Sequence, residues 1–448
     1  EEDNPFGCSY ASLFEGGLTN RTTLNPSLQD AAEAACDAQR ARMSGDLDAS
    51  LVAIDPATGY VEAMVGGSDY DISQVNIATG TGGGGRQAGS TFKAFTLAAA
   101  IEKGISPQTR IDCSSPMTKE VDGREQTFEN FDNIDYGVRT IQSATAVSAN
   151  TGYLRLSEEI GQAATTEMAE RLGVESPMNT VYTTTLGVAS VTPLDMASAY
   201  ATLASGGTKR EPVVITEIED KDGNIIYKAD DASKRVISEE VAGATTNVLR
   251  QVFEASDGTA QTAKLGNGQP AAGKTGTSTD FADHWLVGYT PSLSVATWIG
   301  NPAGSIATDT QLNCNALWKD FMDRACAGKA VEQFPETKAP SYNNAFNEKQ
   351  KAALGAEEEK SSEKQTPTAI TSGSQTATSS QASGTANAKT PPDATGKTLE
   401  EAKELLKDWK AGSVTEYSST VPKDSVIRQY IASDGIVVVV LSTGPKTN

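Results

Sequence analysis

The sequence contains a single histidine, His284, among 448 residues. A metal site with several histidine ligands is therefore excluded, and a serine-histidine-aspartate triad would have only one possible base. Basic residues are also scarce, because 37 lysines and arginines face 58 aspartates and glutamates, which gives a net charge of -21. Such a surface repels nucleic-acid backbones and anionic lipids. If a serine acts as a nucleophile, we expect lysine to activate it.

Long apolar runs and cysteine pairs are missing as well. No apolar stretch approaches the roughly 20 residues that span a bilayer, and the chain begins at Glu1 without a signal peptide. We expect it to be either mature or cut from a longer protein. Cys314 and Cys326 could close a small loop as a disulfide, or remain free buried thiols, and both alternatives stay open. The cysteines, none in the CxxC spacing of a zinc site, are Cys8, Cys36, Cys113, Cys314 and Cys326.

Aromatic residues make up only 6% of the chain, which suggests that part of its length is not packed. The composition changes after about Pro340, and residues 341–390 are rich in Ser, Thr, Ala, Gln, Glu and Lys. Such a segment cannot bury enough surface to offset its chain entropy, so we predict a flexible linker there. A coil of about 50 residues has a mean reach of roughly 40 Å, so the two flanking domains would be loosely coupled.

Residues 391–448 predict a small separate α/β module. Thr398 and Glu401 form a capping box, and the apolar residues that follow recur at helical spacing up to Trp409, with an end near Gly412. Residues 426–430 and 436–441 are typical of strands.

The main domain is predicted over residues 49–340, after an N-terminal joint at 1–48. It has strands at both ends and helices between them, which favours an α+β fold with one antiparallel sheet, completed by both ends of the domain and packed against helices. The predicted strands are 51–54, 60–65, 284–289 and 294–299, and the predicted helices are 91–103, 140–147, 158–172, 193–204 and 239–253.

Ser90 and Lys93 lie three residues apart at the start of a predicted helix, directly after a glycine-rich run. The helix terminus places the hydroxyl in a positive field, and the lysine amine can reach it from the next turn. An amine held away from water near another cation can be neutral and accept the serine proton. The pair alone occurs often by chance, so it needs further support.

Two more segments could complete a site. Lys274-Thr275-Gly276-Thr277 is predicted on a strand, where a cation and hydroxyls suit an extended peptide that ends in a carboxylate. A phosphate-binding loop is excluded because the upstream glycine is missing. Ser148-Ala149-Asn150 follows a helix, and its serine and amide could relay a proton and hold a substrate amide. The signal lies in the combination of the three motifs.

In this combination the main domain resembles the transpeptidase domain of class A penicillin-binding proteins, over roughly residues 17–330. The resemblance implies a serine β-lactamase/penicillin-binding-protein-like fold with a helical subdomain. It also implies that the chain lacks the glycosyltransferase domain and membrane anchor that precede this part in the family. Residues 391–402 and 420–423 are similar to PASTA domains, although residues 430–435 lack a proline and a glycine usual before the last strand.

By this resemblance Ser90 is the nucleophile, Lys93 the general base and Ser148 the proton relay, and Asn150 orients the stem peptide. Lys274, Thr275, Gly276 and Thr277 would bind the terminal carboxylate, and the backbone amides of Ser90 and Thr277 would form the oxyanion hole. The implied reaction is D,D-transpeptidation of peptidoglycan stem peptides ending in D-Ala-D-Ala, at the extracytoplasmic face of a bacterial membrane, with β-lactams as covalent inhibitors.

The same resemblance implies no metal and no cofactor. Two alternatives stay open. One is a D,D-carboxypeptidase or a β-lactamase, for which the segment Glu175 to Asn179 could supply a carboxylate. The other is a catalytically silent wall-binding protein that acts through its C-terminal module.

Overall fold

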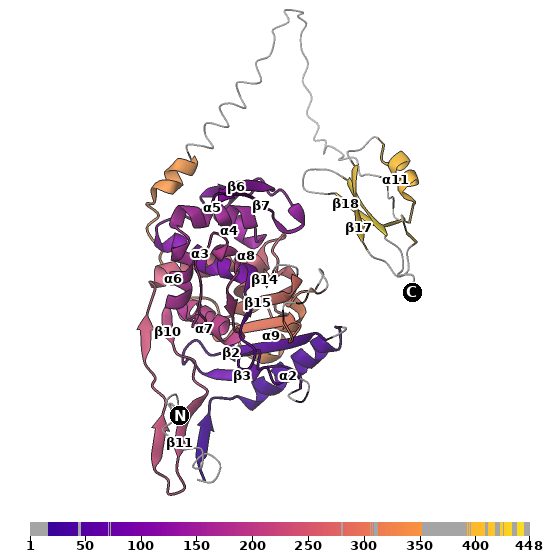
Figure 1. Cartoon of the computed structure of the whole chain (residues 1–448). Helices are drawn as coiled ribbons and strands as arrows, with labels where there is room; N and C mark the ends of the chain where they lie inside the picture. The colour runs from indigo at the N-terminus through magenta and orange to yellow at the C-terminus, as the bar shows by residue number, and fades with distance from the viewer. Residues whose placement is uncertain are drawn as a thin grey trace, which may run out of the picture. The chain divides into compact units, whose positions relative to one another are not determined.

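A computed structural model of the chain describes residues 17–351, except 44–45, 70, 72, 279–280, 305, 307 and 309–311. It also describes residues 392, 394, 396–407, 411–416, 422–423, 425–431 and 437–442. Cys8 and most of the predicted linker lie outside these residues. The chain divides into two units, at 1–366 and 367–448, which are described separately (Figure 1).

The first unit is built on a five-stranded sheet in the order β14-β15-β16-β2-β3, with every neighbouring pair antiparallel. The prediction that both ends of the domain complete one antiparallel sheet is therefore confirmed. The strands are β2 (Asp48–Ile54), β3 (Val61–Val65), β14 (Ala272–Thr277), β15 (Asp283–Tyr289) and β16 (Ser294–Gly300).

Helices cover both faces of this sheet, which explains why β2, β15 and β16 are buried along their whole length. Successive residues of a strand point to opposite faces. Val52 and Ile54 accordingly pack with α3, α7 and α8, whereas Leu51 and Ala53 pack with α2 and α9. The helices are α2 (Pro26–Arg40), α3 (Lys93–Glu102), α7 (Pro193–Ala204), α8 (Glu239–Glu254) and α9 (Asn315–Ala325).

A helical subdomain packs against α3 and α8 and contains α4 (Ile141–Ala146), α5 (Asn150–Ile160) and α6 (Ala163–Leu172) (Figure 1). The prediction of one helix over 158–172 is wrong, because Gly161 adopts a φ of 82° that ends α5. The other short elements of the first unit are η1 (Gly89–Phe92), η2 (Phe131–Asn133), η3 (Thr184–Leu186), η4 (Gln261–Ala263), β4 (Arg86–Gln87), β5 (Arg110–Asp112), β6 (Met117–Val121), β7 (Arg124–Phe128), β8 (Val138–Thr140) and β9 (Ser190–Val191).

An arm extends from the first unit, formed by β1 (Thr19–Thr22), β11 (Ile215–Glu219) and β12 (Ile225–Lys228) (Figure 1). β10 (Thr208–Arg210) and β13 (Ser233–Arg235) pair at its base. No helix in the described ranges is long and apolar enough to cross a membrane. Cys314 and Cys326, at the two ends of α9, are both free thiols, so the disulfide alternative is not realised here.

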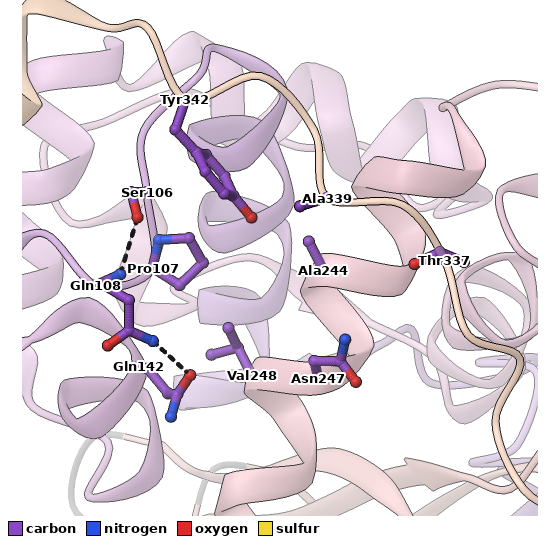
Figure 2. Close-up of a pocket in the computed structure, with 10 residues that line it drawn as sticks. All are labelled: Ser106, Pro107, Gln108, Gln142, Ala244, Asn247, Val248, Thr337, Ala339 and Tyr342. Carbon is purple, nitrogen blue, oxygen red and sulfur yellow. Dashed lines mark hydrogen bonds between the residues drawn. The ribbon is translucent and has the colours of Figure 1, made fainter.

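Residues 330–344 form neither helix nor strand as they run over the first unit, and a helix begins at residue 345; we call residues 330–347 the strap. Gln269 holds the strap through two hydrogen bonds with the backbone of Glu332, at 2.7 and 2.8 Å. Figure 2 shows Thr337, Ala339 and Tyr342 beside α8, where they border a pocket of about 180 Å³. Asn344 and Asn347 then donate to the backbone carbonyls of Lys103 and Gly104 at the end of α3. The packed chain thus continues past residue 340, where we had placed the start of the linker.

The second unit contains α11 (Leu399–Leu405), β17 (Ala411–Glu416), β18 (Val426–Ile431) and β19 (Val437–Ser442). The Thr398–Glu401 capping box is present, as predicted. The helix is shorter than predicted, because Gly412 lies inside β17, which pairs in parallel with β19. Trp409, the last apolar residue of the predicted helix, lies outside the described residues.

Candidate active site

The turn that carries Ser90 is pressed against the end of β14. Gly89 has a φ of +57°, and a Cβ on it would lie only 2.5 Å from the carbonyl oxygen of Thr277. A Cβ on Gly276 would lie 2.7 Å from the carbonyl oxygen of Ala88. Because both positions are glycine, the backbones can touch, and Ser90 comes next to Thr277. Ser90 lies in η1, and α3 begins at Lys93, slightly later than predicted.

Ser148 lies on the sharp connection between α4 and α5, and Asn150 is the first residue of α5. Ser148 has a φ of 61°, a conformation that non-glycine residues rarely adopt. Its amide donates to the Thr145 carbonyl, and the Ala149 amide donates to the Ala144 carbonyl, which closes the turn after α4. Strained residues of this kind cluster at functional sites, where the surrounding structure holds them in place.

Four of the predicted site residues meet around the Ser148 hydroxyl. The Lys93 Nζ lies 3.2 Å from Ser148 Oγ, and the Lys274 Nζ lies 2.8 Å from the same oxygen. Lys93 also donates to the carbonyl oxygen of Ser148 at 2.6 Å and to Asn150 Oδ1 at 2.7 Å. One hydroxyl therefore connects two amines that stand 181 residues apart in the sequence.

Both amines have lowered pKa values, because their side chains are completely buried. Burial penalises the ammonium form, and the positive charge of Lys274 lowers the pKa of Lys93 further, so that it falls well below 10.5. Burial lowers the pKa of Lys274 from 10.5 to about 7. The site thus holds amines that can exist without a proton near neutral pH, and such an amine can serve as a base.

Five of the predicted site residues are accessible to solvent. Ser90, Ser148, Asn150, Thr275 and Thr277 are half-buried, so solvent and a ligand can reach them, whereas the two lysines are sealed behind them. Thr275 Oγ1 lies 2.6 Å from Thr259 Oγ1, which fixes its side chain. Within the described ranges no group of three or more His, Cys, Asp or Glu could hold a metal ion.

The motifs did not reveal several residues that support the site. Asn130 and Glu129 contact Asn150 from the loop after β7. Tyr153 places its ring 5.6 Å from the Lys93 Nζ, and its position three residues after Asn150 is a helical spacing that could have indicated it. His284 is buried on β15, with its Nε2 2.6 Å from Thr308 Oγ1.

Comparisons with known proteins find matches for both units of the chain. The family model "Penicillin binding protein transpeptidase domain" matches residues 49–309, and the PASTA domain model matches residues 389–441. Penicillin-binding protein 1A of Mycolicibacterium smegmatis is 34% identical over 366 residues, which cover 74% of this chain and 44% of that protein. Its counterpart from Mycobacterium tuberculosis is 32% identical over 366 residues, which cover 74% of this chain and 42% of that protein. The chain thus spans less than half the length of these relatives.

Solved structures support the same assignment. The PonA1 protein from Mycobacterium tuberculosis in complex with penicillin V superposes with a TM-score of 0.68 and 30% identity, covering 76% of this chain and 94% of that one. A second structure of PonA1 gives the same TM-score and identity, covering 76% of this chain and 92% of that one. The chain belongs to the penicillin-binding protein transpeptidase family, resembles its class A members, and carries a PASTA domain after the transpeptidase domain.

Proposed function

We propose that this chain is a serine D,D-transpeptidase that cross-links peptidoglycan stem peptides through an acyl-enzyme on Ser90. The observation that carries the proposal is the Ser148 hydroxyl between two buried amines, 3.2 Å from Lys93 Nζ and 2.8 Å from Lys274 Nζ. Amines with lowered pKa values supply the base that a serine nucleophile needs, without histidine.

In the first half of the reaction, Ser90 Oγ attacks the carbonyl carbon between the two terminal D-alanines, and its proton passes to the neutral Lys93 amine. The backbone N–H groups of Ser90 and Thr277 hold the oxyanion, and losing one such donor typically costs about 3 kcal/mol of transition-state stabilisation. The C–N bond then breaks, and Ser148 passes its proton to the leaving D-alanine while it takes up the proton held by Lys93, 3.2 Å away. Lys274, Thr275 and Thr277 bind the terminal carboxylate of the stem peptide beside Gly276, and Asn150 orients the stem peptide.

In the second half, an amine from a neighbouring stem peptide attacks the ester carbonyl carbon, the bond from that carbon to Ser90 Oγ breaks, and the proton that the amine loses passes through Lys93 to Ser90 Oγ. β-lactams would acylate Ser90 in the same way. We assign the reaction to the extracytoplasmic face of a bacterial membrane. We also propose a transpeptidase domain that starts near residue 49 and ends in the strap, followed by a linker up to residue 390 and a PASTA domain.

The test is intact mass spectrometry after incubation with penicillin V, followed by peptide mapping of the adduct. We expect one adduct per chain, located on the peptide that contains Ser90. Ser90→Ala should abolish the adduct and leave the thermal unfolding temperature within a few degrees, because the change is small and half-buried. Ser27→Ala, on an exposed face of α2, is the matched control and should label like the wild type. An adduct on another residue would refute the assignment of the nucleophile.

A hydrolase is the main alternative, and the surroundings of Glu175 argue against a β-lactamase. Glu175 is exposed, and the charged groups that influence it are Glu211, Lys209 and Asp195. The charged and titratable groups that influence Lys93 are instead Lys274 and Cys113. A penicillin adduct that is lost within seconds would support a β-lactamase. Release of D-alanine at the same rate with and without an acceptor amine would support a carboxypeptidase, and a complete lack of acylation would support a silent wall-binding protein.

A further inference from the structure

Helix α5 begins at Asn150 without a capping side chain of its own. The residue before it is Ala149, which offers no side-chain acceptor to the first turn. The first N–H groups of a helix need acceptors from elsewhere. Asn130, from the loop after β7, supplies one: its Oδ1 accepts from the backbone amides of Asn150 at 2.8 Å and Thr151 at 3.1 Å. The cap of this helix therefore comes from a different segment of the chain.

The orientation of the Asn130 carboxamide is fixed by its other hydrogen bonds. The residue is 3% exposed, and its Nδ2 donates to the carbonyl oxygens of Cys113 at 2.9 Å and Ile134 at 2.8 Å. Both N–H groups of the amide are thus used, so Oδ1 is left as an acceptor only. A flipped amide would point its N–H donors at the N–H groups of α5 and its oxygen at the carbonyls of Cys113 and Ile134. All of these buried groups would then lack a hydrogen-bond partner, which is energetically costly.

The same loop also orients the side chain of Asn150. Asn150 Nδ2 donates to the carbonyl oxygen of Glu129 at 2.8 Å, and this leaves its Oδ1 for the Lys93 amine at 2.7 Å. Ser148 precedes Asn150 by two residues, has a φ of 61° and is joined to the first turn of α5 through Ala149. A shift of the first turn of α5 would therefore move Asn150 and Ser148 together relative to both lysines.

We propose that Asn130 is a positioning residue for acylation: by capping α5 from another loop, it holds Asn150 and Ser148 against the two lysine amines. This proposal rests on the proposed function. Alanine at position 130 would leave the amides of Asn150 and Thr151 and the carbonyls of Cys113 and Ile134 without these partners. A misplacement of about 1 Å in an active site can reduce the rate by up to roughly a hundredfold.

The experiment measures the second-order rate constant for acylation of the full chain by penicillin V, together with the thermal unfolding temperature. Asn130→Ala should slow acylation by at least about tenfold, while full labelling is still reached. Thr202→Val is the matched control, because Thr202 is also buried and donates to a backbone carbonyl, that of Leu172 at 2.7 Å, but lies in α7. It should lower the unfolding temperature and leave the rate constant within about twofold.

A second variant separates positioning from folding. Asn130→Asp keeps an acceptor for α5, although its second carboxylate oxygen then faces the carbonyls of Cys113 and Ile134 and costs stability. It also adds a negative charge on the Asn150 side of the site, where the titratable groups that influence Lys93 are Lys274 and Cys113. A nearby carboxylate favours the protonated amine, so the acid limb of the acylation rate against pH should move to higher pH. Above that limb, Asn130→Asp should react faster than Asn130→Ala.

The outcomes are distinguishable. The proposal is overturned if Asn130→Ala slows acylation no more than Thr202→Val does, or if Asn130→Asp is as slow as Asn130→Ala at every pH. Should Asn130→Ala fail to fold, an unmoved acid limb in Asn130→Asp would overturn it and a shifted limb would support it. A wild-type chain that is not acylated at all would refute the proposed function instead.

Discussion

Replacing Lys274 by methionine should stabilise the transpeptidase domain more at pH 7 than at pH 9.5 and should abolish acylation. The Lys274 side chain is completely buried, and burial lowers its pKa from 10.5 to about 7. In the unfolded chain the amine titrates near its ordinary pKa of about 10.4. Between these two values the unfolded chain binds more protons than the folded chain, so this amine makes the free energy of unfolding rise with pH.

The size of the effect follows from the two pKa values. At pH 7 the difference in proton binding lowers the stability of the wild type by about 4 kcal/mol, and near pH 9.5 only about 1 kcal/mol of this remains. Methionine has a similar length and no charge, so Lys274→Met removes the term at both pH values. The stability advantage of the variant over the wild type should therefore shrink by about 3 kcal/mol between pH 7 and pH 9.5.

Equilibrium unfolding in urea, followed by tryptophan fluorescence, measures this difference. Trp285, Trp298 and Trp318 are buried in the first unit, so the signal reports mainly on that unit. Lys264→Met is the matched control, because Lys264 is an exposed lysine on the same unit. An advantage of Lys274→Met that stays constant between the two pH values would refute the claim that a buried amine with a lowered pKa is held in this site.

Two further predictions concern the geometry of the site and the independence of the domains. Gly276→Ala should slow acylation by at least about tenfold, because the new Cβ would push the Ser90 turn away from β14. Gly266→Ala is the control, because its Cβ would meet only Asp323, at 3.7 Å. Equal acylation rates for the two variants would contradict the claim that β14 touches the Ser90 turn at Gly276. Deleting residues 391–448 should leave the rate constant within about twofold, since a long linker couples domains weakly; a tenfold fall would reveal docking between the modules.

The fold could be predicted where the determinants are local. Helix α7 has the predicted bounds, since Thr192 and Asp195 form a capping box and Pro193 occupies the first turn. Helices α2 and α9 were not predicted, although both cover the face of the sheet that carries Leu51 and Ala53. The start of α5 at Asn150 could not be predicted from nearby residues either, because its cap is Asn130, 20 residues earlier in the chain.

The site shows the same division. The motifs identify Ser90, Lys93, Ser148 and Lys274 as candidates, but a serine and a lysine three residues apart do not by themselves make a nucleophile and a base. On an isolated helix in water, the Lys93 amine would have a pKa near about 10.4 and would be protonated at neutral pH. The closing of α5 and β14 over the start of α3 removes this water and brings the second amine to the shared Ser148 hydroxyl. The base is therefore a property of the tertiary structure, and any variant that readmits water at Lys93 should raise its pKa and slow acylation at neutral pH even with every motif residue in place.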